Sequence, residues 1–401
     1  MSDNLRISWL MLLGALTAIA PMSTDMYLPA LLAITLDLGL LPGQVELTFS
    51  GYFIGMLLGM LCYGPLSDRF GRRPPLLFGL GLYSLASFLI ASSESLDSLV
   101  LLRFLQGLGG CAGAVLTVAI VRDLCQPLQA ARVMSMITLV MGMAPVLAPL
   151  LGGFMMELWH WQSIFLLLTA FGGLCLLGVA VSLPESLAQP ASCLALGPVF
   201  RGYLGLLKDR SFIGFSLCQA CTTGAMFAYI VGSPFVLIGL HGIPAAQFGW
   251  FFGINAIGLV AASQVNRWLL RRHSPGYLLA RMLWVPLLAG MLLMLNLVSG
   301  YAGLWLILPA FFILVSSVGL VGPNATALAL AEQGERVGLA SALHVSLTFG
   351  MGMCASLLVA VLQDGSVRPL SLVIFSFAIA GLLVYPRLTA AQPGTTQGET
   401  V

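Results

Sequence analysis

Long apolar segments follow one another along the chain, and short polar connections separate them. Most run for about 20 residues or more, the length that an α-helix needs to cross a bilayer. They are continuous runs, unlike the alternating apolar and polar residues of a membrane β-barrel. The pattern predicts an all-α membrane protein with about twelve transmembrane helices. The predicted spans cover residues 7 to 36, 46 to 64, 75 to 93, 98 to 120, 133 to 156, 163 to 183, 211 to 239, 247 to 268, 276 to 298, 302 to 322, 338 to 362 and 370 to 390.

The composition supports a membrane protein, because 59% of the residues are hydrophobic and only 8% are charged. A soluble protein of 401 residues needs far more charge on its surface. The apolar run after Arg6 resembles a secretory signal. It resumes beyond Pro21, however, so we expect it to be the first span.

The longest connection lies in the middle of the chain. Prolines break continuous helix there, and the basic residues Arg201, Lys208 and Arg210 cluster near its end. It divides the chain into two halves of about six spans each, a layout typical of transporters built from repeated bundles. We predict an N-terminal bundle at 1–183, a central cytoplasmic linker at 184–210, a C-terminal bundle at 211–390 and a disordered cytoplasmic tail at 391–401.

Lysine and arginine residues occupy alternate connections, which places nearly all of them on one side of the membrane. Arg368 is the main exception, and its side carries acids such as Asp37 and Glu157. Basic residues are enriched in cytoplasmic connections, so both termini are predicted to be cytoplasmic. This orientation requires an even number of spans, which favours twelve over eleven or thirteen.

The connection after the second span reads "GPLSDRFGRRP", residues 64 to 74. Gly64 and Gly71 would permit a tight turn between helices, and Pro74 suits the first turn of the next helix. Asp68 beside several arginines would form a charge network at the membrane surface. A topology signal alone would explain the arginines, but it does not require the aspartate between two spaced glycines.

This stretch resembles the signature loop of the major facilitator superfamily, with Gly64, Asp68 and Arg72 at the defining positions. The resemblance implies two pseudo-symmetric six-helix bundles that alternate access to a central cavity. It also implies that Asp68 and Arg72 form a latch between the bundles in the outward-facing state. The latch residues predicted in this way are Gly64, Asp68, Arg69, Gly71 and Arg72.

Arg103 lies inside the fourth apolar segment, where a charge costs on the order of 2.5–3.5 kcal/mol unless it finds a partner or reaches the surface. It could therefore extend to the nearby outer surface. Alternatively, the spacing Arg-x-x-Gln-Gly at 103 to 107 resembles the superfamily's fourth-helix motif, which implies a part in proton transfer.

The fifth span contains "APVLAPLLGG", residues 144 to 153. It resembles the fifth-helix motif of the superfamily's antiporters, which implies exchange rather than symport. The prolines should bend the helix, and the glycines should allow close packing. The motif residues are Ala144, Pro145, Ala148, Pro149, Gly152 and Gly153, with alanines where glycines are commoner in the family.

Three further stretches narrow the resemblance: "STDMYLPAL" (23 to 31), "IVRDL" (120 to 124) and "GPNATALAL" (322 to 330). Together they resemble the bicyclomycin and chloramphenicol resistance (Bcr/CflA) exporters. This implies a proton-coupled multidrug exporter in a bacterial inner membrane. The alternative is a proton-coupled exporter of a natural metabolite, such as a nucleoside, sugar or amino acid, on the same scaffold.

Asp25 is the acid that lies well inside a predicted span. Intramembrane carboxylates are expensive, and they mark ion or substrate pathways. Pro29, four residues on, lacks the N–H that would bond the Asp25 carbonyl, so the helix should open at the acid. We predict that Asp25 and Arg103 couple transport to protons. The other possibility is a structural aspartate that pairs with a base or caps a helix.

Other polar and flexible side chains could line a central cavity for a small molecule. His344 lies in a span, where it could carry a proton or simply pack with hydrogen bonds. The predicted cavity residues are Thr24, Asp25, Arg103, Met141, Tyr229, Asn255 and His344.

The sequence also argues against other classes of protein. It contains no G-x-x-x-x-G-K-[ST] motif for ATP phosphates, so energy should come from an ion gradient, a partner subunit or the solute's own gradient. It has no cluster of nucleophile, acid and base that would suggest an enzyme, and no ring of charge that would suggest a channel. We expect a monomer in the lipid bilayer, with protons as the coupling ion and with no metal, other cofactor or nucleic acid.

Overall fold

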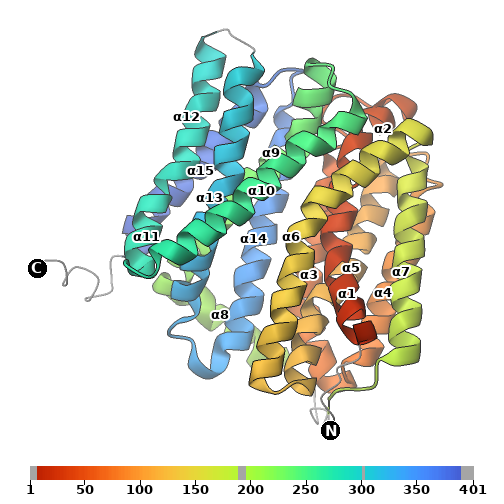
Figure 1. Cartoon of the computed structure of the whole chain (residues 1–401), viewed down its shortest axis with the longest axis vertical. Helices are drawn as coiled ribbons and strands as arrows, with labels where there is room; N and C mark the ends of the chain where they lie inside the picture. The colour runs from red at the N-terminus through yellow and green to blue at the C-terminus, as the bar shows by residue number, and fades with distance from the viewer. Residues whose placement is uncertain (1–6, 188–195, 300–302, 390–401) are drawn as a thin grey trace, which may run out of the picture. The chain divides into compact units, whose positions relative to one another are not determined.

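The computed structural model describes residues 7–187, 196–299 and 303–389. These residues fold into helices and connections without strands, and twelve helical segments are long and apolar enough to cross a membrane (Figure 1). The predicted all-α fold with twelve spans is confirmed. The predicted tail at 391–401 lies outside the described residues, and the orientation of the termini stays a prediction.

The chain divides into two compact units. The first contains the helices up to residue 196 together with residues 237–253, and the second contains the rest. The bundle and linker boundaries predicted from the sequence stay a prediction. The helices of the first half are α1 Ile7–Asp25, the 3₁₀ turn η1 Leu28–Ala30, α2 Leu31–Asp37, α3 Leu47–Phe70, α4 Arg73–Ile90, α5 Leu96–Leu124, α6 Pro127–Leu158 and α7 Gln162–Ser182.

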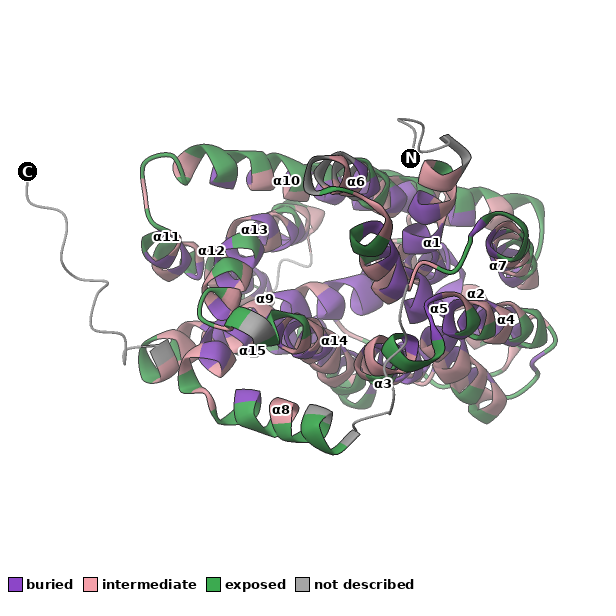
Figure 2. Ribbon diagram, turned by 90° about the horizontal axis from the view of Figure 1, so that it is seen from below, coloured by how far each residue is buried: buried purple, intermediate pink, exposed green. Residues whose placement is uncertain are grey.

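The second half begins with a short helix and continues through long ones. Within the second unit, α9 packs against α13, α14 and α15, and it buries most of its side chains there (Figure 2). The elements are α8 Leu196–Lys208, α9 Arg210–Pro234, the π-helical turn η2 Phe235–Leu240, α10 Ala245–Leu269, α11 Pro275–Met282, α12 Trp284–Val298, α13 Leu304–Leu330, the 3₁₀ turn η3 Gly334–Arg336, α14 Val337–Leu362 and α15 Arg368–Thr389.

Within the first unit, α5 packs against α1, α3 and α4, and small residues bring their backbones close. A methyl group on Gly107 would strike the carbonyl oxygen of Tyr52 in α3, and one on Gly113 would strike that of Leu16 in α1. The glycines of α5 thus let the backbones of neighbouring helices approach closely. Arg103 is therefore carried on a helix that is tightly enclosed.

Several helices extend beyond the apolar runs from which they were predicted. α13 continues to Leu330 rather than ending near residue 322, although Pro323 lies inside it. Asn324 lies in this extension, where its amide donates to the side chain of Asn266 at 2.7 Å and to the carbonyl of Leu320 at 2.7 Å. A polar residue that finds such partners can lie within a helix at the edge of a span.

Candidate functional site

The first span is interrupted at its single buried aspartate. α1 ends at Asp25, the turn η1 contains Pro29, and α2 then resumes the span. This break confirms the prediction that the helix opens at the acid. The end of a helix leaves backbone carbonyls without partners, and these must be satisfied by other groups.

The Asp25 side chain is 4% exposed. It accepts a hydrogen bond from the Thr24 hydroxyl at 2.9 Å. The ion pairs in the described part of the chain are made by Arg72, and none reaches Asp25. The structure thus gives no support to pairing with a base as the reason for this aspartate. An ionised carboxylate buried without a cation is costly, and a bound proton removes that cost.

Arg103 is fully buried, so extension of its side chain to the outer surface is ruled out. Its Nη1 donates to the carbonyl oxygen of Ser23 at 3.0 Å and to the Gln106 side chain at 2.6 Å. Gln106 donates in turn to the hydroxyl of Ser87 at 2.8 Å. The break in α1 explains the arrangement, because Arg103 satisfies a carbonyl near the end of that helix.

Four aromatic rings surround the guanidinium of Arg103. Its carbon lies 4.4 Å from the ring centre of Tyr27 and 4.7 Å from that of Tyr52, with Phe49 at 5.5 Å and Phe165 at 5.8 Å. Rings at these distances attract a cation and replace part of its lost hydration. Within the described protein, Nε and Nη2 find no hydrogen-bond partner. Two donor groups of Arg103 are thus directed among the rings.

A second buried acid, Glu46, was not singled out from the sequence because it lies at the edge of the second span. It immediately precedes α3 and is 4% exposed. Burial raises the pKa of Glu46 to about 6, although backbone hydrogen bonds oppose this. Thr48, two residues further on, shares a 3.0 Å hydrogen bond with Tyr27, one of the four aromatic residues around Arg103.

The fifth-helix motif meets the break in α1. A methyl group on Gly152 would strike the carbonyl oxygen of Met26, the residue after Asp25. A methyl group on Gly153 would also strike a carbonyl oxygen, that of Ala245, which belongs to the same unit. α6 runs unbroken through Pro145 and Pro149, and Ala144 and Ala148 are buried. The predicted close packing is confirmed, and it places this motif directly on the Asp25 segment.

The predicted latch loop centres on Arg72, which is 4% exposed. Its guanidinium binds Asp68 at 2.5 Å and Asp123 at 2.8 Å, and it donates to the Ser67 hydroxyl at 2.7 Å. Asp123 belongs to the "IVRDL" stretch at the end of α5, to which the sequence assigned no role. These contacts confirm a charge network, and its action as a latch stays a prediction.

Gly64 does not form the turn that was predicted for it. It lies inside α3, which continues through Pro65 to Phe70, so the turn consists of Gly71 and Arg72. A proline inside a helix removes one backbone hydrogen bond without always ending the helix, and α3 continues past Pro65 to Phe70. Arg69 lies outside the Arg72 network, and its guanidinium is 5.2 Å from the ring centre of Phe70.

Glu185 was missed by the sequence analysis, which included it in the central linker. Its carboxylate accepts from the backbone N–H of Arg72 at 2.8 Å and of Arg73 at 3.1 Å, at the start of α4. It also accepts from the N–H of Leu187 at 3.0 Å. Partial burial raises the pKa of Glu185, but these hydrogen bonds outweigh it and leave the pKa below its usual value. The signal was an acid directly after the sixth span.

Gly71 is required by its backbone and by its neighbour. Its φ is +87°, in the left-handed region that side chains disfavour. A methyl group there would also strike the carboxylate of Glu185. The tight turn thus depends on glycine at residue 71.

The remaining predicted cavity residues fall into separate groups. In the second unit, the amide of Asn255 donates to the Tyr229 hydroxyl at 2.7 Å, and the Tyr229 ring lies 4.7 Å from that of Phe311. His344 is bonded to Ser216 at 2.9 Å and to Gln219 at 3.0 Å, so it has hydrogen-bonding partners on both ring nitrogens. Met141 is 46% exposed, and Thr24 is held at Asp25.

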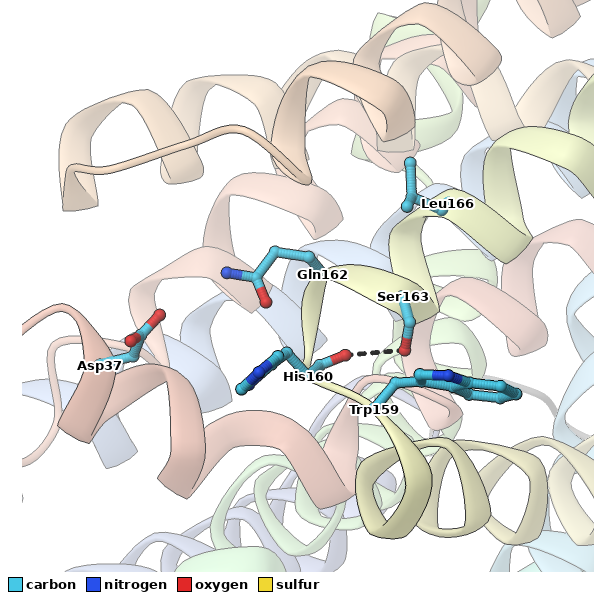
Figure 3. Close-up of a pocket in the computed structure, with 6 residues that line it drawn as sticks. All are labelled: Asp37, Trp159, His160, Gln162, Ser163 and Leu166. Atoms are coloured by element: carbon cyan, nitrogen blue, oxygen red, sulfur yellow. Dashed lines mark hydrogen bonds between the residues drawn. The ribbon is translucent and has the colours of Figure 1, made fainter.

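A surface hollow of about 500 Å³ in the first unit contains none of the predicted site residues (Figure 3). It lies beside the start of α7, where Ser163 donates to the carbonyl of His160 at 2.7 Å. Asp37, on its edge, accepts from the Trp161 indole at 2.8 Å. Its lining consists of Asp37, Trp159, His160, Gln162, Ser163 and Leu166.

The geometry thus joins a buried acid, an enclosed arginine and a close helix contact in one unit. Residues 13–357 match the family description of the Major Facilitator Superfamily. The chain belongs to that family. It is a multi-pass inner-membrane transporter and not an enzyme.

Relatives within the superfamily include drug-resistance proteins. The chain is 32% identical over 383 residues to a "Bicyclomycin resistance protein homolog" of Haemophilus influenzae, covering 95% of this chain and 96% of that one. It is 26% identical over 382 residues to "Multidrug resistance protein D" of Escherichia coli, covering 91% and 92%.

Solved structures agree on the fold. The xylose transporter XylE from E. coli has a TM-score of 0.74 at 14% identity, covering 98% of this chain and 99% of that one. The nucleoside transporter NupG has a TM-score of 0.74 at 12% identity, covering 96% and 99%. At such identities the likeness concerns the fold alone.

Proposed function

We propose that this transporter is a drug:proton antiporter that exports small amphipathic compounds, such as bicyclomycin-like or chloramphenicol-like antibiotics. The observation that carries the proposal is the Asp25 carboxylate, buried without an ion pair at a break in its helix. The resistance proteins among its relatives support the choice of substrate class.

Asp25 takes up a proton when it is open to the outside and releases it when it is open to the inside. Substrate and proton do not bind at the same time, because each stabilises a different conformation of the transporter. One charge moving with the membrane potential contributes about 2.3 kcal/mol per 100 mV, enough for more than roughly tenfold accumulation. Arg103 positions the end of α1 through the carbonyl of Ser23, so the acid keeps a defined place as its charge changes.

Transport into inverted membrane vesicles tests this function. An imposed pH gradient should drive chloramphenicol uptake by the wild type and not by Asp25→Asn. Asp97→Asn is the matched control, because Asp97 is exposed at the first turn of α5. Full proton-driven uptake by Asp25→Asn would refute the coupling role of Asp25.

The substrate class needs a separate measurement. A panel of antibiotics and of nucleosides, sugars and amino acids should be offered to the same vesicles. Competition by the antibiotics alone would support drug export. Proton-driven uptake of one metabolite that no antibiotic inhibits would show that this metabolite, and not a drug, is the substrate.

A further inference from the structure

The central connection contains a helix that the transport cycle does not explain. α8 ends at Lys208, and α9 begins at Arg210, so Asp209 alone separates the two helices. The Asp209 carboxylate caps α9 by accepting from the N–H groups of Ser211 at 3.0 Å and Phe212 at 3.1 Å. Because α9 is a membrane span, this short junction fixes the end of α8 at the boundary of the bilayer.

One side of α8 is seated on its own unit. Leu206 is 2% exposed. A methyl group on Gly202 would lie 3.0 Å from the side chain of Leu339 in α14, and one on Gly205 would lie 3.8 Å from the guanidinium of Arg336. These contacts fix the rotation of α8 about its own axis, and they decide which side chains face away from the unit.

The side that faces away carries large apolar groups. Phe200 is 64% exposed, Leu204 is 41% exposed and Leu207 is 48% exposed. Their spacing of four and three residues places them on one stripe of the helix. Lipid covers exposed apolar side chains in the spans, but α8 lies outside the twelve membrane-spanning segments. In water this apolar stripe would be unfavourable, so we expect another apolar surface to cover it along the helix.

Basic residues flank the stripe. Arg201 and Lys208 are exposed, and their spacing of seven residues places them on one side of α8, next to Phe200 and Leu204. Lys208 is the only lysine of the chain. The neighbouring acid, Asp209, is occupied by the cap of α9 and by the Gln333 amide at 3.2 Å. The outer face of α8 thus combines apolar bulk with net positive charge.

We infer that α8 lies along the surface of an anionic phospholipid bilayer. Phe200, Leu204 and Leu207 enter the boundary between headgroups and acyl chains, and Arg201 and Lys208 bind the phosphates of anionic lipids. A helix with an apolar stripe beside basic residues is suited to this position. A lipid surface is favoured over a protein partner because α8 continues through Asp209 directly into the membrane span α9. The positive charge of its outer face favours anionic lipids.

Hydrogen exchange measured by mass spectrometry on the full chain in lipid nanodiscs tests the inference. Backbone amides of residues 197–208 should exchange more slowly when phosphatidylglycerol is added to phosphatidylcholine. A base near an anionic surface contributes roughly fivefold to binding. Arg201→Gln combined with Lys208→Gln should therefore lower the added protection by roughly tenfold or more.

The matched control is Arg267→Gln combined with Arg271→Gln, which removes two exposed charges from the last turn of α10 and the connection after it. Its residues 197–208 should keep the protection seen in the wild type. Equal exchange in nanodiscs with and without phosphatidylglycerol would overturn the inference. So would protection of α8 that appears only when a soluble protein fraction is added, since a protein would then occupy the stripe.

A second pair of variants tests the apolar part. Phe200→Ser combined with Leu207→Ser should speed exchange across α8 in both kinds of nanodisc, while the transmembrane segments keep their exchange rates. Unchanged exchange in α8 would show that the stripe does not enter the bilayer. This test does not depend on the transported compound or on proton coupling, because it reads the position of α8 alone.

Discussion

Arg103 Nη1 donates a hydrogen bond to the carbonyl oxygen of Ser23 across 3.0 Å, two residues before Asp25. The Ser23 carbonyl thus accepts from the Arg103 guanidinium instead of from a backbone N–H of a continuing helix, because α1 ends at Asp25. The arginine and the aspartate are linked through the backbone of one short segment, and no direct ion pair is needed. A cation and an acid in neighbouring spans are thus connected without an ion pair that would neutralise both charges.

Arg103→Lys should abolish proton-driven transport and lower the free energy of unfolding by about 2 kcal/mol. Lysine keeps the charge, but it lacks the planar fork that binds Ser23 and Gln106 and stacks among the rings. Transport in vesicles and thermal unfolding in detergent measure the two effects. Arg122→Lys, an exposed change in the last turn of the same helix, is the control and should leave both intact.

Gly152→Ala should reduce the maximal transport rate at least tenfold while the protein still reaches the membrane, because the new methyl group meets the carbonyl of Met26. Gly173→Ala in α7 is the matched control, since no atom lies within 4 Å of its added carbon. Equal transport rates for the two variants would show that the close contact between Gly152 and Met26 is not needed for transport.

Asp68→Asn and Asp123→Asn should each slow turnover and leave substrate affinity nearly unchanged. Each removes one of the two carboxylates bound to Arg72, far along α3 and α5 from Asp25. Initial rates and equilibrium binding of the same drug separate the two quantities. A selective loss of affinity would contradict the role assigned to this loop.

Glu46→Gln should stabilise the protein above pH 6 by up to roughly 2 kcal/mol. Burial raises the pKa of Glu46 to about 6 in the folded protein, so the folded state binds more protons than the unfolded state between its ordinary pKa and pH 6. The wild type therefore loses stability as the pH rises through that range, and the variant does not. Thermal unfolding at several pH values measures the difference, which should vanish at low pH.

Glu185→Gln should have the opposite pH dependence. Its hydrogen bonds to the N–H groups of Arg72 and Arg73 hold the pKa of the carboxylate down, so it stabilises the folded state near neutral pH. The variant should lose about 1 kcal/mol at pH 7. This loss should shrink as the pH falls through the pKa of the folded protein. Glu157→Gln, an exposed change in α6, should cause no such loss.

The sequence predicted the number of spans and the break at Asp25, because segment length and Pro29 each act locally. It could not predict the partners of Arg72, since Asp123 and Glu185 lie 51 and 113 residues further along the chain. It also placed Gly64 in a turn, because the spaced glycines at 64 and 71 both permit one, whereas α3 continues through Gly64 and, of the two, only Gly71 has a positive φ. Arg103 could be identified because it lies inside an apolar segment. The four aromatic rings around it could not be predicted, because they come from three distant parts of the chain.

The contact between Gly152 and the carbonyl of Met26 restricts how this transporter can evolve. Position 152 has no room for a side chain, so a mutation there carries a cost whatever drug is present. Met141 lies on the same helix with 46% of its surface exposed, and its side chain can be exchanged without disturbing the backbone at Asp25. Changes in substrate preference should therefore arise at positions such as 141, while the small residues at 152 and 153 stay fixed.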